Sequence, residues 1–239
     1  MSRVVSSIVV AMDGPSGSGK SSTSRGAADR LGLRYLDTGA QFRAMTLWML
    51  RHGVDVHDPA AVAAKSAAPA LESGTDPLVP TITVDGEDVA EAIRSDEVTA
   101  AVSPVATVPE VRARLLELQR AIIADALPAG GIVVEGRDIG SVVWPESEVK
   151  LYLTADAAAR AARRTAETGA ASVAATEADL LRRDAIDSSR ATAPLVVPEG
   201  AIHLDTTPYG LDEVIGLVVG IVEEASHKLA QEPAQEAAP

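Results

Sequence analysis

The feature that most constrains this chain is residues 14–21, which match every fixed position of the pattern G-x-x-x-x-G-K-[ST]. The apolar residues 8–12 before them predict a buried strand, and residues 21–31 after them predict a helix that Gly32 closes. In such a unit the glycines let backbone N–H groups turn toward a phosphate, and the helix N-terminus adds about half a positive charge. The segment therefore predicts a phosphate-binding loop (P-loop), whose lysine reaches the outer phosphates of a nucleotide and whose last serine binds magnesium. A Gly/Ser-rich turn without a ligand is the alternative.

The composition excludes several classes of protein. The chain has 239 residues, enough to bury a sizeable core, and no cysteine, which rules out disulfides and favours a reducing compartment, the cytoplasm. Its formal net charge of −13 argues against a general nucleic-acid-binding protein. The apolar stretch 214–222 is shorter than the roughly 20 residues that span a bilayer, so we expect a soluble monomer with no membrane partner. The polar tail, residues 231–239, is expected to be disordered.

Short apolar runs alternate with helical patterns along most of the chain, which predicts an α/β fold with a parallel sheet and crossover helices. The five candidate strands are residues 8–12, 33–36, 132–134, 149–153 and 201–204. Ligands of open α/β sheets bind beyond the carboxyl ends of the strands. The polar residues that follow these runs should therefore converge on one edge of the sheet: Asp13, Asp37, Glu135, Thr154 and Asp205.

Between residues 65 and 103 the pattern changes to prolines and a short alternating segment. Residues 81–84 alternate, and the Asp-Gly pair after them is a strong signal for a type I′ hairpin turn. We predict an inserted antiparallel β subdomain that lies outside the parallel core. Residues 108–126 then predict an amphipathic helix with Arg112 in its first turns.

Two further segments place charged groups at predicted strand ends. Asp37 ends one strand, and after a glycine turn Arg43 stands early in the next helix, where it could bind a second phosphate. Glu135, Arg137 and Asp138 follow another strand around a glycine turn, and the glutamate could organise magnesium-bound water. The alternatives are a solvated arginine in the first segment and an ordinary surface ion pair, worth at most about 1 kcal/mol, in the second.

A fourth segment carries arginines at helical spacing. Arg160, Arg163 and Arg164 share one face at i, i+3 and i+4, and like charges so placed cost roughly a few tenths of a kcal/mol each. An anion that neutralises them would explain the cluster, whereas the alternative is the solvated surface of a helical hairpin. A second set, at i, i+4 and i+7, again shares one face: Arg183, Asp187 and Arg190.

Taken together, these segments resemble the nucleoside monophosphate kinases, and most closely the bacterial cytidylate kinases, along nearly the whole chain. The P-loop alone is shared by many families, whereas its combination with the other segments in this order is specific. The segments that carry the resemblance are residues 13–21, 36–43, 86–94, 135–138 and 183–191. The resemblance implies a P-loop kinase core, residues 1–230, with a five-stranded parallel sheet flanked by helices, a monophosphate-binding insert at 65–103 and a helical lid at 157–184.

The resemblance also implies transfer of the γ-phosphoryl group of ATP to CMP or dCMP, with Mg²⁺ as the cofactor. It assigns ATP to the P-loop, with Ser21 as the metal ligand: Gly14, Pro15, Ser16, Gly17, Ser18, Gly19, Lys20, Ser21 and Ser22. It assigns the acceptor nucleotide to a second set: Thr38, Arg43, Arg112, Arg137, Asp138, Arg183, Asp187 and Arg190. The catalytic residues that it implies are Lys20, Arg137, Arg160 and Arg163, the last two as lid arginines that close over the transferring phosphoryl group. The chain departs from the family pattern at Phe42, where tyrosine is common, and at Thr38, where serine is frequent.

Two other functions stay open at this point. The same core could phosphorylate another small acceptor, such as UMP or shikimate. The other alternative is a nucleotide-dependent switch that controls a partner. One fact opposes a guanine-specific switch: the chain contains no asparagine, so the Asn-Lys-x-Asp motif is impossible.

Overall fold

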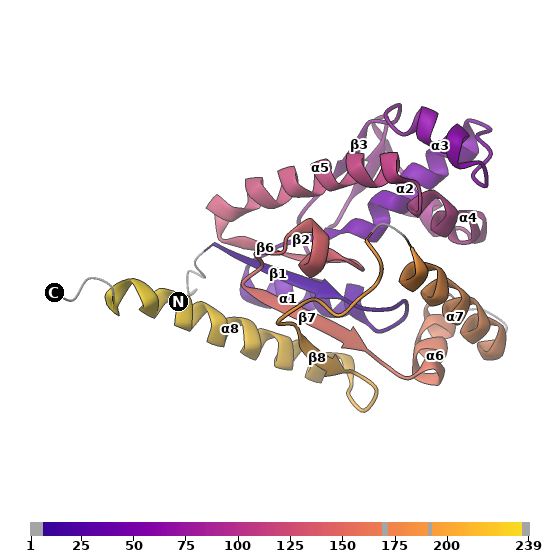
Figure 1. The fold of residues 1–239 in the computed structure, drawn as a ribbon. Helices are drawn as coiled ribbons and strands as arrows, with labels where there is room; N and C mark the ends of the chain where they lie inside the picture. Colours follow the sequence, from indigo (N-terminus) through magenta and orange to yellow (C-terminus); the bar gives the residue numbers. More distant parts are fainter. Residues whose placement is uncertain (1–6, 169–171, 191–192, 236–239) are drawn as a thin grey trace.

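A parallel sheet of five strands forms the centre of the computed structural model, which describes residues 7–168, 172–190 and 193–235 (Figure 1). The strand order is β2-β6-β1-β7-β8. The strands are β1 (Ile8–Asp13), β2 (Arg34–Asp37), β6 (Gly131–Glu135), β7 (Val149–Thr154) and β8 (Ile202–Asp205). Each coincides with a predicted strand and every pairing is parallel, so the predicted fold class is confirmed. The central strands β1 and β6 are buried along their whole length, and their nearly continuous apolar sequences are typical of strands covered on both faces.

Helices cover both faces of this sheet (Figure 1). Alternate residues of β1 point to opposite faces, as the two-residue period of a strand requires. On one face they pack with α1 (Lys20–Leu31) and α8 (Leu211–Gln235). On the other they pack with α5 (Pro109–Ala126) and the short helix η3 (Ile139–Val143). Among the described residues, no helix is both long and apolar enough to cross a membrane.

The insert forms a separate antiparallel sheet of three strands, β3 (Leu71–Ser73), β4 (Ile82–Val84) and β5 (Glu87–Asp88). The turn between β4 and β5 has positive φ at both central residues, 52° at Asp85 and 81° at Gly86, so the predicted type I′ hairpin is confirmed. The strand β3 was not predicted, because it lies outside the hairpin with the Asp-Gly turn and is defined by its pairing with β4.

Four helical segments surround the small sheet and share an apolar core with it. They are α2 (Thr38–Arg51), α3 (Pro59–Lys65), η1 (Ala92–Arg94) and α4 (Asp96–Ala106). A backbone hydrogen bond from Tyr35 N to Thr75 O, at 2.9 Å, joins the edge strand β2 to the insert. The insert is therefore a packed body that contacts the edge of the main sheet at β2.

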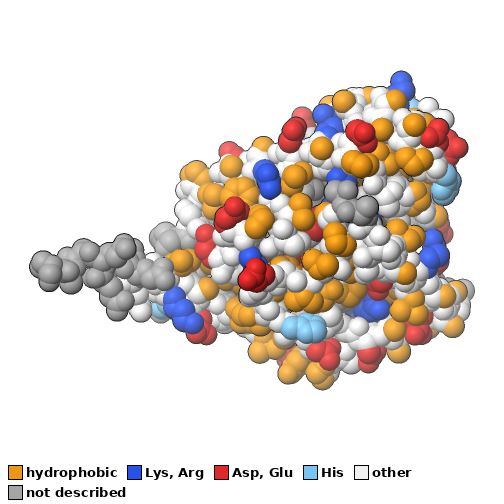
Figure 2. Space-filling view, in the orientation of Figure 1, with side chains coloured by type: hydrophobic (Ala, Val, Ile, Leu, Met, Phe, Trp, Pro, Cys, Tyr) orange, Lys and Arg blue, Asp and Glu red, His pale blue; other side chains and the backbone are white. Residues whose placement is uncertain are grey.

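A helical hairpin of α6 (Ala157–Thr168) and α7 (Val173–Ser189) lies beyond the carboxyl end of β7 (Figure 1). The helix α7 continues past residue 184, the expected end of the lid. On the face drawn in Figure 2, acidic and basic side chains are interspersed among apolar ones. The described elements also include the short helix η2 (Leu127–Ala129), which precedes β6.

The C-terminal helix corrects the expected extent of the tail. The helix α8 continues to Gln235, so the first part of the expected tail, residues 231–239, is helical. Alanine, glutamine and glutamate in this segment have high helix propensities, which the polar composition concealed. Residues 236–239 lie outside the described part of the chain.

Candidate active site

The P-loop joins β1 to α1 and folds over the side chain of its own lysine. Lys20 Nζ donates hydrogen bonds to Pro15 O at 2.6 Å and to Ser18 Oγ at 3.4 Å. Gly14 has a φ of 144°, and a Cβ there would lie 2.0 Å from the carbonyl oxygen of Leu153, so the loop approaches β7 this closely only with glycine. Burial, and then repulsion by neighbouring positive charge, lowers the pKa of Lys20. A phosphate beside the ammonium would oppose that shift, which favours an anion site at this loop.

Glu135, the last residue of β6, lies directly beside the P-loop. Its Oε1 accepts a hydrogen bond from the Tyr35 hydroxyl, and its Oε2 accepts one from Ser21 Oγ at 2.9 Å. Thr38 Oγ1 donates to the main-chain carbonyl of Glu135 at 2.7 Å. Burial, and then the charge of Asp37, raises the pKa of the Glu135 carboxyl. Hydroxyl and carboxylate oxygens beside a phosphate site are donors that Mg²⁺ prefers, so Ser21 and Glu135 fit a magnesium ion.

Asp13 fixes the turn that follows β6. Its two carboxylate oxygens accept hydrogen bonds from the backbone N–H groups of Ile139 and Gly140, both at 2.8 Å. Burial raises the pKa of Asp13 to about 6, although these hydrogen bonds oppose the shift. The contact ties the end of β1 to the segment that carries Arg137 and Asp138.

Arginines from five different segments face the P-loop around a cavity of about 160 Å³: Arg43, Arg94, Arg137, Arg164 and Arg183. Arg43 from α2, Arg137 after β6 and Arg183 from α7 line this cavity together with Lys20 and Ser21. Burial, and then the charges of neighbouring guanidinium groups, lowers the pKa of Arg43 to about 9 and that of Arg183 to about 10. Crowded cations repel one another, and an anion between them would offset the repulsion. The P-loop and these arginines thus form two cationic sides of one cavity.

Arg43 is oriented by the insert. Its Nη1 donates to the carbonyl oxygen of Ile93 at 3.1 Å and to Thr99 Oγ1 at 2.9 Å. On the opposite side, the Nε of Arg183 is buried without a hydrogen-bond partner among the described residues. A buried N–H donor without an acceptor is costly, which is further support for an anionic ligand in this cavity.

Arg137 connects the cavity to a second group of charges. Its Nε donates to Asp187 Oδ2 at 2.9 Å, and its Nη2 donates to Ser16 Oγ of the P-loop at 2.9 Å. Arg190 Nη1 lies 3.8 Å from Oδ1 of the same aspartate. One guanidinium group therefore links the P-loop to the charged end of α7.

Two residues of the predicted acceptor set, Arg112 and Asp138, form a buried ion pair. The guanidinium carbon of Arg112 lies 5.4 Å from the centroid of the Phe42 ring. The phenylalanine that replaces the usual tyrosine thus contributes a cation–π contact in place of a hydroxyl. Five of the predicted acceptor residues line neither the cavity of about 160 Å³ nor the larger cavity of about 880 Å³ that adjoins it: Thr38, Arg112, Asp138, Asp187 and Arg190.

The structure separates the three arginines of α6. Arg160 Nη1 donates to Ser16 O at 3.0 Å and pairs with Asp184. Arg163 donates to the carbonyl oxygen of Thr206 at 2.7 Å and to its hydroxyl at 2.9 Å. Neither arginine lines the cavities, whereas Arg164 lines both. The arginine of the expected lid that lines the candidate phosphate site is therefore Arg164, to which the resemblance assigned no role.

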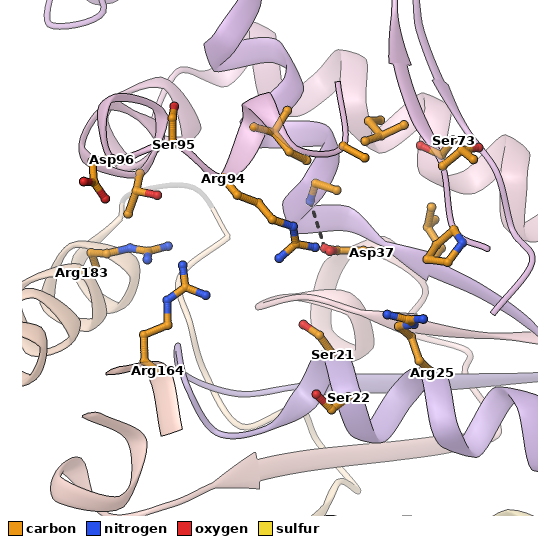
Figure 3. Close-up of a pocket in the computed structure, with 18 of the residues that line it drawn as sticks. Ser21, Ser22, Arg25, Asp37, Ser73, Arg94, Ser95, Asp96, Arg164 and Arg183 are labelled. Atoms are coloured by element: carbon orange, nitrogen blue, oxygen red, sulfur yellow. Dashed lines mark hydrogen bonds between the residues drawn. The ribbon is translucent and has the colours of Figure 1, made fainter. Parts of the chain in front are cut away.

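A larger cavity of about 880 Å³ adjoins the smaller one and shares Ser21, Arg164 and Arg183 with it. Figure 3 shows Arg164 and Arg183 extending into this space from one side, while Arg94 enters it from the insert. Arg25 from α1 also lines it. Sequence reasoning missed Arg25 and Arg94 as site residues, although Arg94 belongs to one of the segments that carry the resemblance.

A P-loop at the carboxyl edge of a five-stranded parallel sheet, faced by arginines from an insert and a helical hairpin, defines a P-loop kinase. The sequence profile described as "Cytidylate kinase" matches residues 10–224. The cytidylate kinase of Streptomyces coelicolor is 58% identical over 217 residues, which cover 91% of this chain and 93% of the relative. Those of Streptomyces avermitilis and Mycobacterium leprae are 55% and 46% identical, over 93% and 92% of this chain and 95% and 97% of the relatives.

The chain belongs to the cytidylate kinase family. The resemblance inferred from the sequence is confirmed, and the protein is a phosphotransferase of the nucleoside monophosphate kinase class.

Proposed function

We propose that the enzyme transfers the γ-phosphoryl group of ATP to CMP or dCMP in a magnesium-dependent reaction, giving ADP and CDP or dCDP. The observation that carries the proposal is the shared cavity of about 160 Å³, in which Lys20 and Ser21 face Arg43, Arg137 and Arg183. Two phosphate groups held by these two sides would meet within one cavity. Membership of the cytidylate kinase family supports cytidine nucleotides as the acceptors.

The donor side holds the triphosphate. The backbone N–H groups of the P-loop and the Lys20 ammonium bind its phosphates, and Arg137 stays anchored to the loop through Ser16 Oγ at 2.9 Å. Ser21 and Glu135 would hold Mg²⁺, which neutralises charge on the phosphates. The loose transition state spreads negative charge over its oxygens, so catalysis consists of positioning and of cations placed in advance.

The acceptor side holds the monophosphate and its nucleoside. Arg43 and Arg137 bind the acceptor phosphate. Thr38, Arg112 and Arg190 recognise the cytosine, and Asp187 with Arg183 recognises the ribose. In this arrangement Arg164 supplies the lid cation at the transferring group, because it lines both cavities. Arg160 and Arg163 instead fix α6 to the P-loop and to Thr206.

Closure of the insert at 65–103 and of the helical lid at 157–184 would exclude water from the reacting phosphates. In the closed site a phosphate oxygen of the acceptor, rather than water, receives the phosphoryl group, and ADP is the leaving group. ATP hydrolysis without CMP should therefore be much slower than transfer with CMP. Equal rates of ADP release with and without the acceptor would contradict this part of the proposal.

Steady-state kinetics with ATP and Mg²⁺ against CMP, dCMP, UMP and AMP test the proposed function. The expected result is the highest kcat/KM for CMP or dCMP, loss of activity with excess chelator and recovery on adding Mg²⁺. Preferred phosphorylation of UMP or of shikimate would overturn the acceptor assignment. Nucleotide-dependent binding of a protein partner without phosphoryl transfer would favour a switch.

We further propose that the enzyme acts as a monomer in the cytoplasm. In support of this proposal, one chain supplies both the P-loop side and the arginine side of the smaller cavity. The cytoplasm supplies the ATP that the reaction consumes. Light scattering after size exclusion, in the presence of both nucleotides, should give the mass of one chain, 24.6 kDa.

A further inference from the structure

We propose that Tyr35 is a positioning residue for phosphoryl transfer, whose hydroxyl holds the Glu135 carboxylate toward Ser21 and away from Lys20. The inference rests on the proposed function and deepens it, because none of the segments that carry the resemblance includes this tyrosine.

The contacts of Glu135 give Tyr35 this role. The tyrosine belongs to β2, and 2% of its surface is exposed. Its hydroxyl donates to Glu135 Oε1, while Ser21 Oγ donates to Glu135 Oε2 at 2.9 Å. Each carboxylate oxygen thus has a donor from a different element. Two donors on opposite oxygens fix the plane of the carboxylate, which neither donor does alone.

Both the side chain and the main chain of Tyr35 are held by neighbouring elements. Its ring packs in the apolar core under α1 and α8, and its main-chain N–H donates to Thr75 O of the insert at 2.9 Å. The side chain also borders the larger cavity, while its packing in the core restricts its movement. The hydroxyl is therefore a fixed donor, placed by the β2 strand and not by a mobile loop.

The consequence of losing the hydroxyl follows from the neighbouring cation. The charges of Lys20 and Glu135 act on one another in this buried site. Without the tyrosine donor, Glu135 Oε1 would be a buried acceptor with no partner, and turning toward the Lys20 ammonium would satisfy it. That turn would take the acceptor away from Ser21 and would compete with phosphate for Lys20. One hydroxyl thus keeps the metal-binding side and the phosphate-binding side of the P-loop separate.

Tyr35→Phe removes the hydroxyl and leaves the ring in the core. Loss of a group that orients a metal ligand costs about 10- to 100-fold in metal affinity or activity. We expect Mn²⁺, a spectroscopic substitute for Mg²⁺, to bind about 10-fold more weakly to the variant with a non-hydrolysable ATP analogue, measured by electron paramagnetic resonance. We also expect kcat with CMP to fall about 10- to 100-fold while KM for CMP changes little. Tyr209→Phe, at a tyrosine with 42% of its surface exposed, is the matched control.

A double-mutant cycle with Glu135→Gln separates positioning from a general structural effect. If Tyr35 acts through Glu135, then Tyr35→Phe should change Mn²⁺ affinity little further in the Glu135→Gln background. Thermal unfolding of each variant monitors the fold. Unchanged Mn²⁺ affinity in Tyr35→Phe, or additive losses in the cycle, would overturn the inference. If the unmutated enzyme fails to phosphorylate CMP, the proposed function fails, but the Mn²⁺ measurements still decide the role of Tyr35.

Discussion

Replacing Asp13 with asparagine measures how much the buried charge of Asp13, at the edge of the site, lowers the free energy of unfolding. Burial raises the pKa of Asp13 from 3.8 to about 6. Because the folded state holds this proton more tightly than the unfolded state, ionisation favours unfolding as the pH rises. The contribution of Asp13 to stability is therefore greatest below about pH 4, falls between about pH 4 and 6, and is constant above that range. The full shift corresponds to about 3 kcal/mol.

Urea unfolding between pH 4 and 8, followed by circular dichroism, tests this reasoning. Asparagine cannot ionise, so the free energy of unfolding of the original protein minus that of Asp13→Asn should decrease by about 2.5 kcal/mol across this range. At pH 4 the folded protein holds Asp13 protonated, and like asparagine it then presents one carbonyl oxygen and one donor group to the two backbone N–H groups, so the two proteins should differ least in hydrogen bonding there. Asp29→Asn, at an exposed position of α1, is the control. A difference between Asp13→Asn and the original protein that does not vary with pH would refute the argument.

Three further predictions follow from the site and the fold. Lys20→Ala should abolish turnover with CMP and leave the circular dichroism spectrum unchanged, since the ammonium serves the phosphates; retained turnover would contradict the donor assignment. Arg164→Ala should lower kcat at least about 100-fold, as loss of one transition-state donor does, whereas Arg30→Ala on the outer face of α1 should not, and equal kcat values would remove Arg164 from the site. Gly131→Ala should destabilise the fold by about 3 kcal/mol or more in urea unfolding, because its Cβ would lie 2.0 Å from a carbonyl oxygen of β1. Gly200→Ala, with a φ of 73° and open space at the Cβ, should cost only about 1 kcal/mol, and similar losses in both would contradict the clash.

The sheet and its edge could be predicted because their signals are local. The central strands β1 and β6 are buried throughout and have nearly continuous apolar sequences, and the P-loop follows the first strand in the order that the fold requires. The hairpin of the insert was equally visible, since its Asp-Gly turn supplies the two positive φ angles. The strand β3 left no such signal, because its pairing with β4 is decided by contacts across the insert.

Which of the three arginines of α6 lines the cavity could not be predicted in the same way. Helical spacing places Arg160, Arg163 and Arg164 on one face, but it does not say which of them reaches the cavity. That depends on how α6 packs against Ser16 and Thr206, which are far away in the sequence. Such contacts appear only when the chain is folded.

Tyr35 was missed for a related reason. Its hydroxyl acts on Glu135, 100 residues further along the chain, and a tyrosine in an apolar strand looks like an ordinary core residue. The identity of the acceptor nucleotide could not be predicted from the individual residues either. They indicated only two anion sites that face one another. Cytidine specificity was inferred from the combination of segments that resembles one family.

The most direct test of the central claim, that donor and acceptor phosphates share one cavity, is the affinity of a ligand that fills both sides. Adenosine and cytidine joined by five phosphates should bind about 10²- to 10⁴-fold more tightly than ATP or CMP alone, because the second half would bind as part of the same molecule. Calorimetric titration in the presence of Mg²⁺ measures this difference. An affinity no greater than that of ATP would contradict the account.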